Sequence, residues 1–233
     1  MSMVLRPARE RGHADHGWLN SAHSFSFADY YDPAHMGFRA LRVINEDVVR
    51  PGTGFGMHGH RDMEIISYVI RGTLAHEDTM GGKGVLRRGD VQSMSAGTGI
   101  RHSEFNGSSS EDVHFLQLWI LPPRQGLPPS YRQEGIPDQD KLNTLKLIAA
   151  PNGAGGVLVC HRDIRVFAGV LEPGAAVSHR LESGRGAWIQ LVSGSLDVDG
   201  LKMTAGDGVA IEETGAIGIT AQAGSELLLF DLD

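Results

Sequence analysis

The chain has 233 residues, enough for one large or two ordinary domains, and its composition is that of a globular protein. Its formal net charge of −7 argues against a surface that follows nucleic-acid phosphates, so we expect no direct nucleic-acid binding. The first residues are too charged for a secretion signal, and the apolar runs are too short to cross a bilayer. We therefore expect a cytoplasmic protein without membrane contact.

Several histidines have no partner at metal-binding spacing. His13, His16, His23 and His35 fit no compact ligand set, and we expect the N-terminal segment that carries them to pack across the first β unit. His76 lies beside an expected hairpin turn, where we expect it to face solvent. We do not expect these histidines to bind a metal.

Short runs of aliphatic and aromatic residues, separated by glycines, recur along the chain and predict strands with tight turns. The clearest runs cover residues 64–70, 113–121, 186–200 and 226–232. No long stretch has a helical period, so we expect an all-β protein with few short helices, such as one near residues 130–142.

Two couplets of potential metal ligands stand out, His58-Gly-His60 and His102-Ser-Glu104. Residues two apart on a β-strand point to the same face, so each couplet can present two donor groups to one point. Three imidazoles and one carboxylate are a complete protein ligand set for a divalent transition metal that keeps open positions for a substrate. The couplets predict a metal site if their strands face each other.

The stretch 122–143 contains half of the ten prolines and few large apolar residues, which is typical of a linker. We therefore expect an N-terminal domain over residues 1–121 and a C-terminal domain over residues 144–233.

The two halves share their turn residues, which predicts two related antiparallel β units. A Pro-Gly pair at 51–52, a glycine at 72 and a Gly-Asp pair at 89–90 recur at 173–174, 194 and 206–207. This alignment puts Arg180 and Glu182 in place of the first couplet, and Ile219 and Ala221 in place of the second. We therefore expect a metal site in the first domain and a metal-free second domain.

The couplets, within HGH-x3-E and MSAGTGIRHSE, and the opening segment RGHADHGWLNSAHSFSFADYYDP resemble the pirin-like branch of the bicupins. The similarity is close to bacterial pirin-like quercetin 2,3-dioxygenases and covers essentially the whole chain. It implies two tandem cupin β-barrels of jelly-roll type, packed face to face, with one metal in the N-terminal barrel. The ligands that it implies are His58, His60, His102 and Glu104.

The resemblance implies Fe(II) as the metal, although Zn, Mn, Co, Ni, Cu or Cd could occupy such a site. Many metal cupins take their carboxylate from the first motif and have a proline in the second, where this chain has Ser95. Glu64 therefore competes with Glu104 as the fourth ligand. The pirin-like match favours Glu104, and we expect Glu64 to be a supporting or structural residue.

The implied activity is O2-dependent cleavage of a flavonol such as quercetin, with ring opening and loss of carbon monoxide. Glu104 is the candidate base, because a carboxylate bound through one oxygen can accept a proton with the other. Apolar walls are needed around an aromatic substrate, and candidates for them are Phe55, Met57, Phe38 and Trp119.

An alternative is a metal-dependent regulatory protein that acts through protein partners, as pirin-like proteins are also associated with such roles. An apolar cavity open to solvent at the metal would favour the enzyme, because a partner-binding module does not need one. A monomer is the default expectation.

Overall fold

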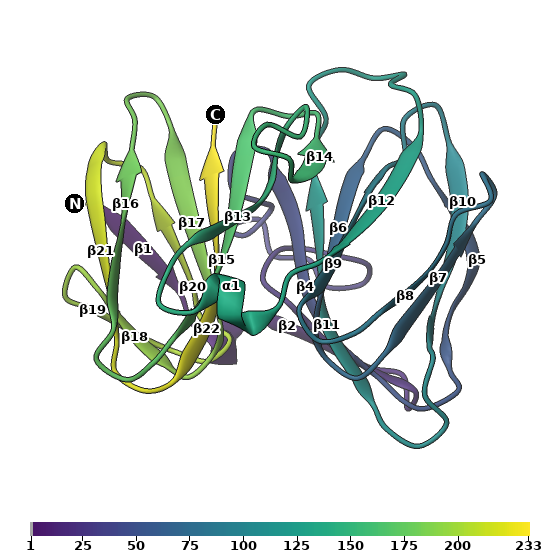
Figure 1. Ribbon diagram of the computed structural model, residues 1–233, viewed down its shortest axis with the longest axis horizontal. Helices are drawn as coiled ribbons and strands as arrows, with labels where there is room; N and C mark the ends of the chain where they lie inside the picture. The colour runs from purple at the N-terminus through teal and green to yellow at the C-terminus, as the bar shows by residue number, and fades with distance from the viewer. Residues whose placement is uncertain (1) are drawn as a thin grey trace. The chain divides into compact units, whose positions relative to one another are not determined.

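The computed structural model describes residues 2–233, which divide into two compact units. Residues 12–135 and 158–162 form the first unit, here called the N-terminal barrel; the remaining described residues form the C-terminal barrel. Each barrel is built from one large and one small antiparallel β-sheet (Figure 1). The prediction of an all-β protein with only short helices is confirmed.

The N-terminal barrel has a large sheet in the order β12-β9-β6-β11-β4-β3-β2 and a small sheet in the order β5-β10-β7-β8. The large sheet comprises β2 (Gly12–Asp15), β3 (Leu19–His23), β4 (Leu41–Val49), β6 (Glu64–Arg71), β9 (Asp90–Ser95), β11 (Val113–Ile120) and β12 (Ser130–Gly135). The small sheet comprises β5 (Gly54–His60), β7 (Leu74–Asp78), β8 (Lys83–Leu86) and β10 (Ile100–Asn106). The short β14 (Leu158–Cys160) also belongs to this unit.

The C-terminal barrel repeats this arrangement, with a large sheet in the order β1-β20-β17-β22-β15-β13 and a small sheet in the order β16-β21-β18-β19. The large sheet comprises β1 (Met3–Arg6), β13 (Lys146–Pro151), β15 (Ile164–Leu171), β17 (Gly186–Ser193), β20 (Gly208–Ile211) and β22 (Ser225–Leu232). The small sheet comprises β16 (Ala176–Leu181), β18 (Ser195–Val198), β19 (Leu201–Thr204) and β21 (Gly215–Ala221). The matching strand orders agree with the internal repeat predicted from the turn residues.

Two short helices complete the C-terminal unit, the 3-10 helix η1 (Ala8–Glu10) and α1 (Asp138–Lys141). Within residues 2–233, neither of these helices approaches the length and apolar character needed to cross a bilayer. The helix α1 lies in the stretch where a short helix was expected.

The ends of the barrels differ from the expected domain boundaries. The stretch 122–143 is not a plain linker, because it contains β12, which pairs with β9 of the N-terminal barrel. Residues 3–6 form β1, which pairs with β20 of the C-terminal barrel. Each added strand covers a sheet edge whose backbone groups would otherwise lack partners. Composition does not reveal such strands, because backbone pairing needs no apolar side chains.

The interiors of the two barrels differ in polarity. The C-terminal barrel has a continuous core of aliphatic side chains contributed by both of its sheets. The N-terminal barrel has smaller apolar clusters and, besides these, polar side chains that are almost fully buried: Ser21, His23, Asn45, Asp47, Ser67, His76, Gln92, His102, Glu104 and Gln117. Polar groups are costly to bury unless they are partnered, so this concentration marks a functional interior.

Candidate metal centre

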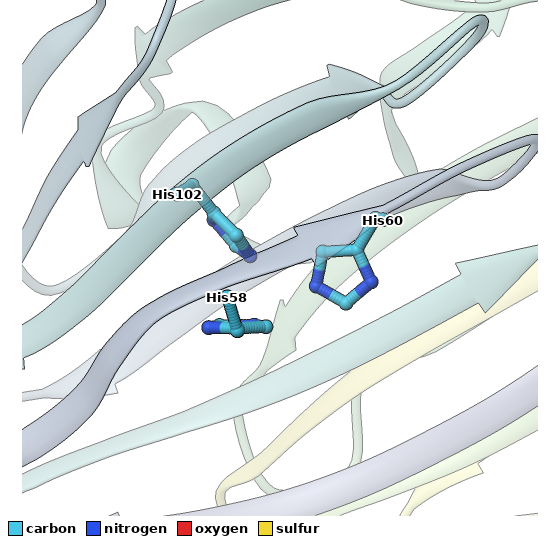
Figure 2. Close-up of side chains that lie close together, drawn as sticks. All are labelled: His58, His60 and His102. Carbon is cyan, nitrogen blue, oxygen red and sulfur yellow. The ribbon is translucent and has the colours of Figure 1, made fainter.

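Three histidines from the two couplets meet inside the N-terminal barrel. His58 and His60 lie on β5, and His102 lies directly opposite His58 on the antiparallel neighbour β10. Their ring centroids are 4.5 to 4.9 Å apart, and one nitrogen of each ring lies within 4.8 Å of those of the other two. Figure 2 shows the three imidazoles gathered around a common space.

A β-bulge in β5 sets which side chains face this space. His102 pairs with His58, but Glu104 pairs with Phe55, so two residue steps on β10 match three on β5. The extra residue puts both Phe55 and the histidines on the inner face, although strict alternation would separate them. Met57 falls between them on the outer face and is 44% exposed.

The histidines are suited to binding a metal because their rings are neutral and offer nitrogen lone pairs. Among residues 2–233, His102 is fully buried and neither of its ring nitrogens has a hydrogen-bond partner. Burial and the neighbouring histidines lower the pKa of His102 to about 2, and burial and His58 lower the pKa of His60 to about 4. Neutral imidazoles with unused lone pairs are the form that binds a metal.

The ring of His58 is oriented by its own strand. Its Nδ1 donates a hydrogen bond to the carbonyl oxygen of Gly56 at 2.8 Å, which leaves Nε2 as the atom with a lone pair. These donor atoms therefore fit a divalent transition metal, by both chemistry and spacing.

Glu104 is buried behind the histidines and is held by three donors. Its Oε1 accepts hydrogen bonds from Ser67 Oγ at 3.1 Å and Gln92 Nε2 at 2.6 Å, and its Oε2 accepts one from Gln117 Nε2 at 2.7 Å. Burial raises the pKa of Glu104 to about 7, although these three hydrogen bonds favour the carboxylate. The donors can stabilise an anion at this position.

The two glutamines that contact Glu104 are themselves oriented by aromatic side chains. Trp119 Nε1 donates to Gln117 Oε1 at 3.2 Å, and the Tyr131 hydroxyl donates to Gln92 Oε1 at 3.2 Å. Each amide therefore directs its NH2 group at Glu104. Sequence reasoning missed this support; the available signal was Gln117, a polar residue in the middle of the apolar run VHFLQLWIL.

The structure places Glu104 in a second group of potential ligands that shares His102 with the first. Its members are His76, His102 and Glu104, and all three are buried. The expectation that His76 faces solvent is wrong, because His76 lies opposite Glu104 on β7 and alternation turns it inward. Its ring stacks on Tyr131 with centroids 4.1 Å apart, and its Nε2 lies 3.0 Å from Asp78 Oδ2.

Glu64 lies on the face of β6 opposite to that of Ser67, which contacts Glu104. Its Oε1 accepts a hydrogen bond from Ser95 Oγ at 2.7 Å, and its Oε2 lies 3.2 Å from His161 Nδ1. These contacts agree with a structural role, and they leave Glu104 as the carboxylate nearer to the histidines.

A cavity of about 530 Å³ lies beside the histidines in the N-terminal barrel. Phe55 lines it and lies 6.4 Å from His58 between ring centroids. Trp119 packs edge-on against His60 at 4.9 Å and against Phe27, another lining residue, at 5.4 Å. Of the expected aromatic candidates, Phe55 and Trp119 thus lie next to the histidines, whereas Phe38 does not line this cavity.

Strand register corrects the alignment of the two repeats. β16 pairs with β21 without a bulge, and this register puts His179 and Leu181 in the places of His58 and His60. Ile217 and Ile219 take the places of His102 and Glu104. The alignment based on turn residues assigned the wrong positions, because it did not account for the extra residue in β5 or for the different length of the loop before β21.

Comparison with known proteins gives matches along the whole chain. The family model for pirin matches residues 4–120, and the model for the quercetinase C-terminal cupin domain matches residues 147–232. The quercetin 2,3-dioxygenase of Escherichia coli strain K12 is 48% identical over 230 residues, which are 99% of this chain and 98% of that protein. A pirin-like protein of Caulobacter vibrioides is 40% identical, with 97% of both chains covered.

A solved structure shows the same fold. The crystal structure of the bacterial pirin YhhW from Escherichia coli in complex with nickel(II) has a TM-score of 0.94 at 47% identity, with 99% of each chain covered. Together with the two family models, this likeness shows that the chain belongs to the pirin family and is built from two cupin domains.

Proposed function

We propose that the protein is a metal-dependent dioxygenase that cleaves flavonols such as quercetin. The observation that carries the proposal is the aromatic-walled cavity beside the cluster of His58, His60 and His102. A small aromatic substrate needs such a space, whereas a module that binds protein partners does not. The names of close relatives, such as the Escherichia coli quercetin 2,3-dioxygenase, support the same reaction class.

The proposed metal ligands are His58, His60, His102 and Glu104, and the proposed native ion is Fe(II). A bound divalent ion would supply Lewis acidity toward the flavonol hydroxyl and a site for dioxygen. The low pKa values of His60 and His102 keep both rings neutral at neutral pH. The crystal structure of the relative YhhW is a nickel(II) complex, so nickel is a second candidate for the ion.

Glu104 is the proposed base for the 3-hydroxyl proton of the flavonol. A carboxylate that is bound to a metal through one oxygen can accept a proton with the other, and burial of Glu104 favours its protonated form. Gln92 and Gln117 hold its carboxylate in place. The aromatic walls orient the substrate and exclude water from the reacting ring.

The decisive experiment is anaerobic reconstitution with Fe(II), followed by measurement of oxygen uptake and carbon monoxide release with quercetin. We expect one metal per chain, and uptake and release that both depend on it. The matched control is His102→Ala, which removes the fully buried histidine of the cluster and should lose metal and turnover together. Oxygen uptake no greater than that of the metal-free protein would contradict the proposal and favour the partner-binding alternative.

A further inference from the structure

The N-terminal segment of this barrel, residues 13–30, builds much of the cavity wall. Its apolar lining includes Trp18, Phe27 and Phe55, and Trp18 packs edge-on against Phe55 with centroids 5.2 Å apart. A planar ring is well accommodated between aromatic walls. The N-terminal segment therefore packs across this barrel, as expected, and forms one wall of the cavity.

One end of the cavity is polar and buried. Its residues pair across β3 and β4, with Ser21 opposite Asp47 and His23 opposite Asn45. All four line the cavity, and none is more than 3% exposed. His23 Nδ1 lies 2.8 Å from Asn45 Oδ1, and Ser21 Oγ donates to Asp47 Oδ1 at 2.5 Å.

Asp47 has fewer partners than Glu104 and Asp231, two other buried carboxylates. Among residues 2–233, the Ser21 hydroxyl is the one hydrogen-bond donor to Asp47, and no cationic side chain pairs with it. By contrast, Glu104 has three donors and Asp231 contacts both His179 and Arg185. A buried carboxylate with spare acceptor capacity beside a cavity is suited to accept a hydrogen bond from a ligand.

The polar end is also connected to the candidate metal centre. Gln117 lines the cavity and donates to Glu104 Oε2, and Phe55 contacts the ring of His58. A molecule that fills the cavity therefore lies beside Asp47 and beside two side chains that contact the candidate metal centre, Gln117 and Phe55.

We propose that Asp47 and its neighbours Ser21, His23 and Asn45 form a recognition site for a phenolic hydroxyl of the substrate. The hydroxyl donates its hydrogen to Asp47, and the ring that carries it lies between Phe27 and Phe55. The proposal rests on the proposed function and adds the substrate's orientation, with its hydroxylated pendant ring in the cavity and its enolisable ring at the histidines. It makes Asp47 a specificity-determining residue.

The test compares Asp47→Asn with the wild type on two flavonols. Quercetin carries two hydroxyls on its pendant ring, and galangin carries none. We expect Asp47→Asn to lower kcat/KM for quercetin about 10- to 100-fold, mainly through KM, since a hydrogen bond to a charged group is lost. Galangin should be processed as by the wild type. Asp140→Asn, the same change at an exposed position outside the cavity, should leave the turnover of both substrates unaffected.

Calorimetric binding of both flavonols to the metal-free protein separates this proposal from the proposed function. A weaker Kd for quercetin alone in Asp47→Asn would support the recognition site even if neither flavonol is turned over. Equal effects on both flavonols, or no effect on either, would overturn it. If Asp47→Asn does not fold, Asp47→Ser is measured in the same way, with galangin binding as the check that the cavity is intact.

Discussion

Two buried carboxylates in the N-terminal barrel show how the surroundings of a residue decide its use. Burial raises the pKa of both Glu104 and Asp47 to about 7. Hydrogen bonds from Ser67, Gln92 and Gln117 offset the cost of burying the Glu104 carboxylate and fix its position. Within the part of the chain that the structure describes, Asp47 accepts a hydrogen bond only from the hydroxyl of Ser21, so its ionised form is expected to be unfavourable in the folded protein until a ligand binds.

Asp47→Asn should therefore stabilise the metal-free protein in a pH-dependent way. The folded pKa of Asp47 is about 7 and its ordinary value 3.8, so the folded state holds an extra proton between these pH values and wild-type stability falls as pH rises. The groups that act on Asp47 are Glu104 and Glu46, which raise its pKa, and His114 and Ser21, which lower it. Asparagine has no such titration.

We expect the two proteins to be equally stable near pH 4. Above pH 7 the variant should be more stable by about 2 to 4 kcal/mol. Urea unfolding in the presence of a chelator at several pH values measures this difference, and Asp29→Asn serves as the exposed control. A constant difference across the pH range would contradict the assignment.

Glu104→Gln separates metal binding from proton transfer. The amide oxygen can still bind a metal, but the amide cannot accept the substrate proton. We expect much of the metal to remain while turnover is lost, with a stability cost of about 1 to 3 kcal/mol, because an NH2 group now faces the donors of Gln92 or Gln117. Metal content by mass spectrometry and oxygen uptake with quercetin provide the measurements. Unchanged turnover in the metal-loaded variant would exclude Glu104 as the base.

At the scale of elements, local patterns predicted the strands and the two couplets, but not the contacts between strands. Each couplet needed only alternation along one strand, so His58 could be grouped with His60, and His102 with Glu104, from the sequence. The inward position of Phe55 depends on a bulge, which is a property of two paired strands. The same holds for His76, whose inward face follows from its pairing with β10.

The close approach of β5 and β10 depends on a glycine at the start of β5. A Cβ added to Gly54 would lie 2.3 Å from the carbonyl oxygen of Glu104 and 2.5 Å from the Cα of Phe105, and both are backbone atoms. Gly54→Ala should therefore push β5 away from β10 and reduce stability by about 1 to 3 kcal/mol.

The same change should weaken nickel binding, since His58 and His60 follow on the displaced strand. Gly56→Ala is the matched control, because an added Cβ there meets no atom within 4 Å. Thermal unfolding and nickel titration of both variants distinguish a specific close approach from a general effect of alanine in β5. Equal behaviour of the two variants would contradict this explanation.

At the scale of the whole molecule, two barrels of the same topology have different interiors. Where the N-terminal barrel has His58, the C-terminal barrel has His179, which lies 2.9 Å from Asp231 Oδ2. Asp231 is fully buried and also pairs with Arg185, so an ion-paired network takes the place of a metal site. The repeat was recognisable from its turns, but this substitution was not, because Arg185 and Asp231 are far apart in the sequence.

Asp231→Asn should destabilise the protein without affecting the candidate metal centre. Without the carboxylate, the guanidinium of Arg185 stays largely buried but loses its main partner. Removing one partner of a buried ion pair lowers the free energy of unfolding by about 3 to 5 kcal/mol. The exposed ion pair of Lys202 and Asp197 provides the control, since Lys202→Met should leave the melting temperature unchanged. Differential scanning calorimetry measures stability, and nickel titration at 25 °C measures the site. Folded Asp231→Asn should bind nickel with wild-type affinity; a large loss of affinity would mean that the C-terminal barrel supports the metal centre as well as its own core.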